Sequence, residues 1–259
     1  MNYIHTNFYN FFFKQKLADK KEVNLNKTFE LMEKQLKMIG SKKIIIPTYN
    51  YDFVKKKIFN VNKDISQVGS FTEFFRKKYN QNRTNIPIYS SCSNFKNNNI
   101  VIKNNFIDIL GEHSDFNYLL QKNGNIINFE ENFGPTFIIF IEKLNSKKII
   151  YRYSKKINGL LLRDKIKKNI SIDLFVRPRK LDISYNLDKI KKDLIKNKIL
   201  KQEKIGIFNY EIYNSRKFFE FCSNKLEKDN LYFLDNKSKN ILKKNKINLK
   251  NKELIKKFD

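Results

Sequence analysis

The segment 43–51 reads KIIIPTYNY and contains the clearest strand in the sequence. Its run Ile44–Ile46 is wholly apolar, as in strands buried on both faces of a sheet. A helix is predicted just before it, over residues 24–39, because apolar residues recur there at helical spacing and Gly40 can follow as the C′ residue. The two together indicate a fold that mixes helices and strands.

The remaining sequence continues this alternation. Ser70-Phe71-Thr72-Glu73 has the form of a capping box and predicts a helix through about Tyr79. Ser114 can cap another helix. Further helices are predicted at 136–143, 188–198 and 215–228, and strands at 99–103, 125–129, 148–153, 156–162, 171–177 and 206–213. We therefore expect an α/β or mixed α+β fold in which one central sheet is flanked by helices.

One domain is expected, since 7 Gly and 4 Pro leave no linker that would divide the chain. Residues 236–259 differ from the rest, with nine Lys and two acidic residues. We predict that 1–235 form the domain and that 236–259 form a solvated tail, in which Leu249 and Phe258 suggest some packing.

The net charge of +27, from 53 Lys and Arg against 26 acidic residues, invites a nucleic-acid or membrane-surface interpretation. Only 7 of the 53 are Arg, the side chain favoured for bidentate recognition of phosphates and bases. Lys, Asn and Ile also have AT-rich codons, so base composition explains much of the charge. With no RNP, helix-turn-helix or zinc-finger signal, nucleic-acid binding is the least favoured function.

Cys92 and Cys222 lie 130 residues apart, and with two His they offer no metal-ligand spacing and no disulfide framework. The first 16 residues lack the apolar core and cleavage site of a signal peptide. No run approaches the 18 apolar residues of a membrane span. We expect a soluble cytoplasmic protein without a metal.

Generic catalytic motifs such as the Walker loop and HExxH are absent. A more specific signal is a series of phrases in a fixed order. They are Ile46-Pro47-Thr48-Tyr49-Asn50-Tyr51; Val68-Gly69-Ser70-Phe71-Thr72-Glu73-Phe74-Phe75-Arg76; Arg83-Thr84-Asn85-Ile86-Pro87-Ile88-Tyr89-Ser90; Gly111-Glu112-His113-Ser114; Thr136 with Glu142 six residues later; and Tyr151-Arg152-Tyr153.

This series resembles the aminoglycoside 3-N-acetyltransferase family, which includes relatives that acylate amino sugars on nucleotide carriers. The family pattern is PT(F/Y), VGxxxExxR, RSxHPxxS, a G-x-x-S helix start, TxxHxxE and a (P/Y)xRY strand. Order and intervals match over about residues 40–180, and a looser match continues to about 235. The resemblance implies the family's fold and transfer of an acyl group from an acyl-CoA to a sugar amine.

The resemblance also implies site residues. The phosphates of CoA suit helix N-termini and cationic side chains, and the tetrahedral oxyanion needs hydrogen-bond donors. We expect acetyl-CoA or another acyl-CoA to be bound by Ser70, Arg83, Ser114 and Thr136, and the acceptor by Tyr51, Glu73 and Arg76. The serines have ordinary alternatives as N-caps, and the arginines as structural ion pairs.

The TxxHxxE histidine, which in the family is taken as the catalytic base, is replaced here by Ile139, and the histidine of the RSxHP phrase is replaced by Ile86. Isoleucine cannot transfer a proton, so the base stays open. His5, in a weak echo of the family's N-terminal HSS phrase, or His113 can supply it, or Glu142 can act directly or through water. Otherwise the chain is a degenerate member that binds CoA or a sugar nucleotide without efficient turnover.

The acceptor is predicted from charge. Aminoglycosides are polycations and need an acid-rich pocket, yet the phrase before Thr136 offers only Glu130 and Glu131. A nucleotide-linked amino sugar is an anion and suits a basic protein better. We therefore expect modification of an amino sugar for surface polysaccharide rather than inactivation of an antibiotic.

Overall fold

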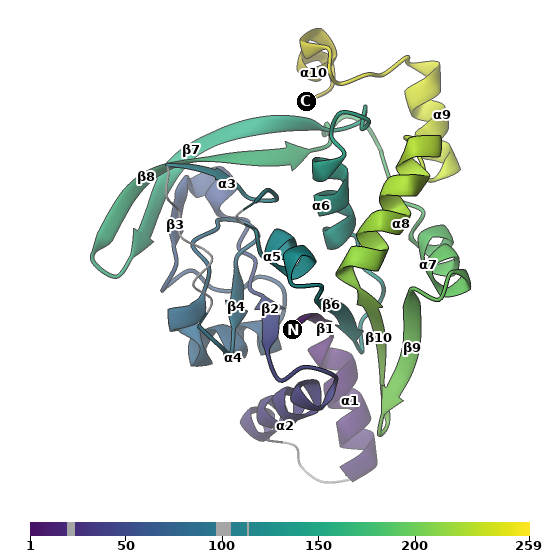
Figure 1. Ribbon diagram of the computed structural model, residues 1–259. Helices are drawn as coiled ribbons and strands as arrows, with labels where there is room; N and C mark the ends of the chain where they lie inside the picture. The colour runs from purple at the N-terminus through teal and green to yellow at the C-terminus, as the bar shows by residue number, and fades with distance from the viewer. Residues whose placement is uncertain (20–23, 97–104, 113) are drawn as a thin grey trace.

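Two β-sheets form the centre of the computed structural model, which describes residues 1–19, 24–96, 105–112 and 114–259 (Figure 1). The larger has the strand order β4-β2-β1-β6-β10-β9. Its strands β2, β1 and β6 run parallel, and the others pair antiparallel. Their bounds are β1 (Asn2–Thr6), β2 (Ile44–Pro47), β4 (Ser91–Ser93), β6 (Asn125–Phe129), β9 (Leu200–Ile205) and β10 (Phe208–Asn214).

The smaller sheet has the order β3-β7-β8-β5. A long hairpin dominates it, made of β7 (Tyr153–Arg163) and β8 (Ile166–Val176), which arches over the top of the molecule in Figure 1. The short strands β3 (Ile58–Asn60) and β5 (Phe106–Asp108) pair parallel with its two outer edges.

Helices cover both faces of the larger sheet, because its central strands alternate between two cores. On β1, Ile4 enters one core with residues of α1 (Phe8–Asp19), α2 (Leu25–Met38) and α4 (Ser70–Lys78). Tyr3 enters the other with residues of α5 (Asp115–Gln121), α6 (Thr136–Leu144) and α8 (Ser215–Lys228). The remaining helices are α3 (Phe53–Lys56), α7 (Leu187–Lys196), α9 (Asn236–Lys244) and α10 (Lys252–Phe258).

The expected mixed α+β class is confirmed, with two sheets in place of one. The predicted strand 148–153 is wrong up to residue 152, because Tyr151 and Arg152 turn into a buried polar cluster before β7 begins. The predicted strand 99–103 lies outside the described residues. Residues 236–259 form α9 and α10, and Leu249 between them is buried in the main core.

The predicted capping box at Ser70 does not form. The N-cap of α4 is Gly69, whose φ of 129° favours glycine, and no side chain caps the helix. Glu73 turns away instead, accepting from the Ser66 amide at 2.7 Å and pairing with Arg76. Among the described residues, no helix is both long and apolar enough to cross a membrane.

Candidate active site

The carboxyl ends of β1, β2 and β6 meet at one edge of the larger sheet, because the three strands are parallel. His5 of β1 lies opposite Asn128 of β6 in the strand register. His5 stands two positions after Tyr3, and Asn128 stands two positions after Ile126. Tyr3 and Ile126 belong to the core that also contains residues of α6, so the side chains of His5 and Asn128 face the same side of the sheet as they do. The edge therefore brings an imidazole and an amide together beside the loop that leads into α6.

A chain of hydroxyl groups crosses this edge. The Tyr3 and Tyr49 hydroxyls lie 2.8 Å apart, and Tyr49 also hydrogen-bonds the side chain of Thr136, the first residue of α6. Burial raises the pKa of Tyr3 and of Tyr49 well above the usual value, so both phenols stay protonated at neutral pH. The predicted site residue Thr136 thus belongs to a set of neutral hydrogen-bond donors.

His5 lies next to this chain, with its ring centroid 5.4 Å from that of Tyr3. Burial lowers the pKa of His5 to about 4, because an imidazolium would lose its hydration there. At neutral pH the ring is uncharged and has one nitrogen lone pair free to accept a proton. Of the residues predicted as catalytic, His5 is the one that the described structure places beside the hydroxyl chain.

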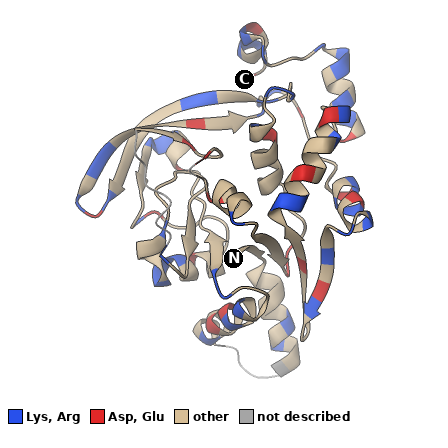
Figure 2. Cartoon of the chain, viewed as in Figure 1, with Lys and Arg blue, Asp and Glu red and all other residues tan. Residues whose placement is uncertain are grey.

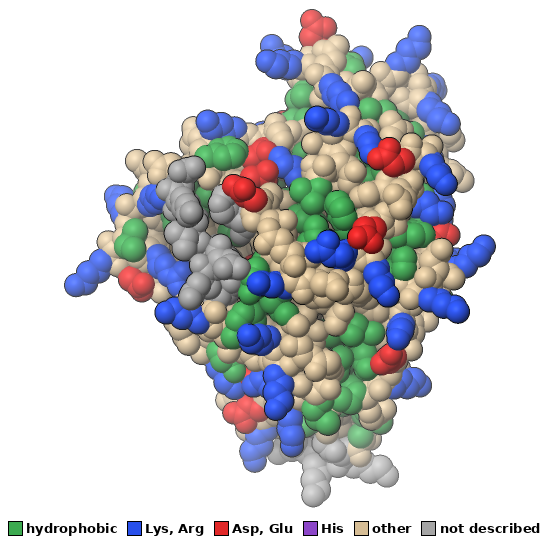
Figure 3. All heavy atoms as spheres, in the orientation of Figure 1, with side chains coloured by type: hydrophobic (Ala, Val, Ile, Leu, Met, Phe, Trp, Pro, Cys, Tyr) green, Lys and Arg blue, Asp and Glu red, His purple; other side chains and the backbone are tan. Residues whose placement is uncertain are grey.

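A cavity of about 720 Å³ opens beside Asn128, between α1, the loop after β6 and the β9–β10 hairpin. Two lysines and four glutamates line it, namely Lys14, Lys204, Glu130, Glu131, Glu203 and Glu211. Lys14 pairs with Glu130 at 2.7 Å, and Lys191 pairs with Glu211. This acidic lining stands out in a chain of net charge +27, whose cations are scattered over the face seen in Figure 3.

Glu142 lies elsewhere and is fully buried. The Tyr151 hydroxyl donates to its Oε1 at 2.6 Å, the Tyr185 hydroxyl donates to its Oε2 at 2.5 Å, and Arg152 Nε lies 2.5 Å from Oε2. Both carboxylate oxygens are thus occupied by residues of the protein. This arrangement suits a structural ion pair that joins α6 to the start of β7.

Ile139 lies one turn before Glu142 on the half-buried face of α6. That face also carries Thr136 and Lys143, and Lys143 pairs with Asp108 and Asp173. Ile86, at the second position that the family pattern fills with histidine, is buried in the core. Isoleucine thus stands at both positions that the family pattern fills with histidine.

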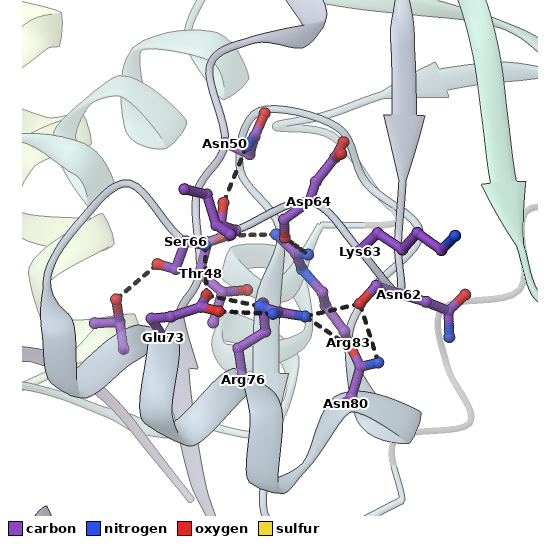
Figure 4. A network of polar contacts seen from close by, with 12 residues as sticks. Thr48, Asn50, Asn62, Lys63, Asp64, Ser66, Glu73, Arg76, Asn80 and Arg83 are labelled. Carbon is purple, nitrogen blue, oxygen red and sulfur yellow. Dashed lines mark hydrogen bonds and ion pairs between the residues drawn. The ribbon is translucent and has the colours of Figure 1, made fainter.

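Arg83, Arg76 and Glu73 belong to a separate buried network (Figure 4). Arg83 is 1% exposed and donates to the carbonyls of Val61, Asp64 and Thr48. Arg76 forms a bidentate pair with Glu73, with both N···O distances 2.7 Å. The two terminal nitrogens of Arg83 and all three guanidinium nitrogens of Arg76 donate hydrogen bonds within the protein, and these bonds fix the loop after β2 and the loop before α4.

The other predicted residues are dispersed. Ser114 caps α5, accepting from the Asn117 amide at 3.1 Å, and is buried. Ser70 is exposed at the start of α4. Tyr51 is 48% exposed and lies 6.3 Å, centroid to centroid, from Tyr49, so it borders the hydroxyl chain. His113 lies outside the described residues.

Sequence reasoning missed Tyr3, Asn128 and Asp115. Tyr3 and His5 stand two residues apart, a strand spacing that was available in the sequence. Asp115 follows the Ser114 cap and is 4% exposed; the Ser91 hydroxyl donates to it, and its charge acts on Tyr3. Burial raises its pKa to about 6.

Asp115→Asn is expected to stabilise the protein at pH 7. Between about pH 4 and pH 6 the folded carboxyl keeps a proton that the unfolded one has lost, so stability falls as pH rises through this window. The loss at neutral pH is on the order of 3 kcal/mol, and an amide avoids it. Urea unfolding at pH 4 and pH 7 measures the effect, and Asp188→Asn, in the first turn of α7, is the control.

His5 has the opposite slope, because its neutral form is favoured in the folded state and stability falls as pH drops from about 6.5 towards 4. Asp115→Asn should therefore expose a steeper loss of stability on acidification than the parent protein has. A variant less stable than the parent at pH 7 would contradict this account of Asp115.

No family model matches the chain, and a search of curated proteins found no match. Solved structures do match. The YokD protein from Bacillus subtilis is 13% identical, with a TM-score of 0.62 over 88% of this chain and 87% of that one. A mutant of aminoglycoside acetyltransferase AAC(3)-IVa in complex with a gentamicin is 13% identical, with a TM-score of 0.62 over 90% and 84%. AAC-IIIb in a binary complex with CoASH is 13% identical, with a TM-score of 0.63 over 88% and 89%.

These matches extend over nearly the whole of each chain, and at such low identity they establish the fold. The resemblance found in the ordered phrases is confirmed at that level. The chain has the fold of the aminoglycoside 3-N-acetyltransferases.

Proposed function

We propose that the protein transfers an acyl group from acetyl-CoA or another acyl-CoA to the amino group of an amino sugar. The fold is shared with an acetyltransferase solved with a gentamicin and with one solved with CoASH. The observation that carries the proposal is a neutral His5 paired in register with Asn128, whose side chain lines the acidic cavity. Two free, buried cysteines fit a reducing cytoplasmic setting.

In the proposed reaction the acceptor nitrogen attacks the thioester carbonyl, the C–N bond forms, and the C–S bond breaks to release the thiol. His5 accepts the proton that the amine loses. The hydroxyls of Tyr49 and Thr136, near the first turn of α6, are the proposed donors to the developing oxyanion. Glu142 is assigned a positioning role, since both of its oxygens are already bound within the protein.

The cavity favours a cationic acceptor. Glu131 and Glu203 line it, and no lysine partner for either is seen among the described residues. Carboxylates attract a sugar ammonium group and repel a diphosphate. The preference for a nucleotide-linked amino sugar rests on the overall charge of the chain and stays a prediction. Comparing the rates with a nucleotide-linked amino sugar and with a polycationic sugar in the same assay tests it.

Thiol release from acetyl-CoA tests the proposal, with an aminoglycoside, free glucosamine and a nucleoside-diphosphate amino sugar as acceptors. We expect turnover with the aminoglycoside, and a KM about fivefold higher in the double variant Glu131→Gln, Glu203→Gln with kcat unchanged. Glu220→Gln, an exposed glutamate of α8, is the matched control. Absence of thiol release with every acceptor would refute the proposal.

A second candidate function is binding without turnover, which Ile139 favours because it removes the proton-transfer group of the family pattern. In that case CoA or a sugar nucleotide raises the melting temperature while no thiol appears. The same assay, run beside a thermal melt, separates the two functions.

A further inference from the structure

A second concave site lies on the β7–β8 hairpin and has the opposite charge. Its volume is about 500 Å³. The register of the hairpin sets Ile157, Leu174 and Val176 on one face, and they form an apolar floor. Five cationic residues are among those that line the site: Lys57, Lys155, Lys156, Arg177 and Arg179. Lys155 shares the face of the floor, whereas Lys156 lies on the opposite face of the hairpin. We call this site the basic groove.

The basic groove already holds an anion that belongs to the protein. Asp259 is the acidic side chain among the described residues that line it, and its Oδ2 lies 2.5 Å from Lys155 Nζ. The hydrogen bonds from Lys155 and from the Tyr153 hydroxyl, together with the charge of Arg179, lower the pKa of Asp259. The carboxylate of Asp259, 104 residues from Lys155 in the sequence, thus lies beside two cations of the site, Lys155 and Arg179.

The segment that delivers Asp259 is weakly held. No residue of α10 is fully buried, and Leu254, Ile255 and Phe258 are only partly covered by the core. The Lys180 amide donates to the Phe258 carbonyl at 3.1 Å. In Figure 1, α10 lies at the top of the molecule, near the open end of the hairpin, where β7 begins and β8 ends. Elements with few buried contacts open at low free-energy cost.

We propose that the basic groove binds a phosphate ester and that Asp259 competes with it from within the chain. A phosphate group carries more negative charge than a carboxylate and offers three acceptor oxygens, which suits convergent Lys and Arg side chains. The apolar floor fits the uncharged part of the same ligand. Binding displaces Asp259, so α10 acts as an autoinhibitory element.

The basic groove connects to the candidate active site through aromatic side chains. Arg177 lies 4.8 Å from the ring of Tyr185 and acts electrostatically on Tyr89. Tyr89 in turn lies 5.2 Å, centroid to centroid, from Tyr49 of the hydroxyl chain. This link rests on the proposed function: the phosphate ester is then the phosphate-bearing end of an acyl-CoA or of a nucleotide-linked sugar.

Binding measurements on the full chain test the inference without turnover. The probes are coenzyme A, dephospho-coenzyme A, a nucleoside-diphosphate sugar and pyrophosphate. Isothermal titration calorimetry measures the dissociation constant of each probe. Asp259→Asn should tighten binding of at least one probe by about two- to fivefold, the size that a competing exposed ion pair can reach. The double variant Lys155→Gln, Arg179→Gln should weaken the same probe by at least fivefold.

The control is Asp182→Asn, which removes an exposed ion pair with Lys237 of the same N···O distance, 2.5 Å, and should leave binding unchanged. Preference for coenzyme A over dephospho-coenzyme A identifies the ester as its 3′-phosphate, and preference for the nucleotide sugar identifies the acceptor. If Asp259→Asn and Asp182→Asn behave alike with every probe, the inference is wrong. Tighter probe binding without any thiol release would keep the inference and reject the proposed acyltransferase.

Discussion

Replacing His5 with glutamine is expected to lower kcat for acyl transfer by about 10²- to 10⁴-fold, the range that general-base catalysis supplies. Glutamine retains a polar side chain on β1 but cannot accept a proton from the acceptor amine. Because burial holds the pKa of His5 near 4, the ring is uncharged throughout the neutral range and keeps one nitrogen lone pair. Initial rates of thiol release at saturating acetyl-CoA measure the effect.

The matched control is His113→Gln, which changes the one other histidine of the chain. If His5 is the base, His113→Gln keeps its rate, and coenzyme A stabilises both variants against heat to the same extent. A large rate loss in His113→Gln with a normal His5→Gln would transfer the assignment to His113. Equal, small losses in both would leave neither histidine as the base.

The sequence predicted the elements with strong periodic patterns. The helices near 25–38, 136–144 and 215–228 and the strand Ile44–Pro47 were found where apolar spacing predicted them. β9 was missed because it reads LKQEKI: it is an edge strand, largely exposed, so it carries no apolar alternation. The predicted strand 171–177 covers only the second part of β8 for a similar reason. The first residues of β8, from Ile166 to Lys168, pair with β7 without being buried.

The site was harder to predict than the fold. Sequence motifs indicated which residues matter but not which contacts they make. Arg83 and Arg76 looked suited to phosphate, yet backbone carbonyls and Glu73 use their guanidinium groups. The acidic cavity depends on Glu130 and Glu211, which are 81 positions apart in the sequence and meet only because β10 pairs with β6. Figure 2 shows the same problem for the cations, whose positions along α7, α8, α9 and the β7–β8 hairpin give no single stripe.

Replacing Glu142 with glutamine is expected to destabilise the protein by about 3–5 kcal/mol, the cost of breaking a buried ion pair from one side. The amide keeps the shape of the side chain but leaves Arg152 charged and 6% exposed without its counter-ion. The Tyr151 and Tyr185 hydroxyls also lose their charged acceptor. Urea unfolding followed by circular dichroism gives the free energy of unfolding.

The double variant Glu142→Leu, Arg152→Met is the control, because removing both charges together avoids the unpaired one and should recover most of the stability. The kinetic result separates this structural role from catalysis. If Glu142 only positions α6 against β7, Glu142→Gln keeps its kcat per folded molecule at a temperature well below its transition. A variant with parental stability but a kcat reduced 100-fold or more would instead make Glu142 the base, and His5→Gln would then have to retain its rate.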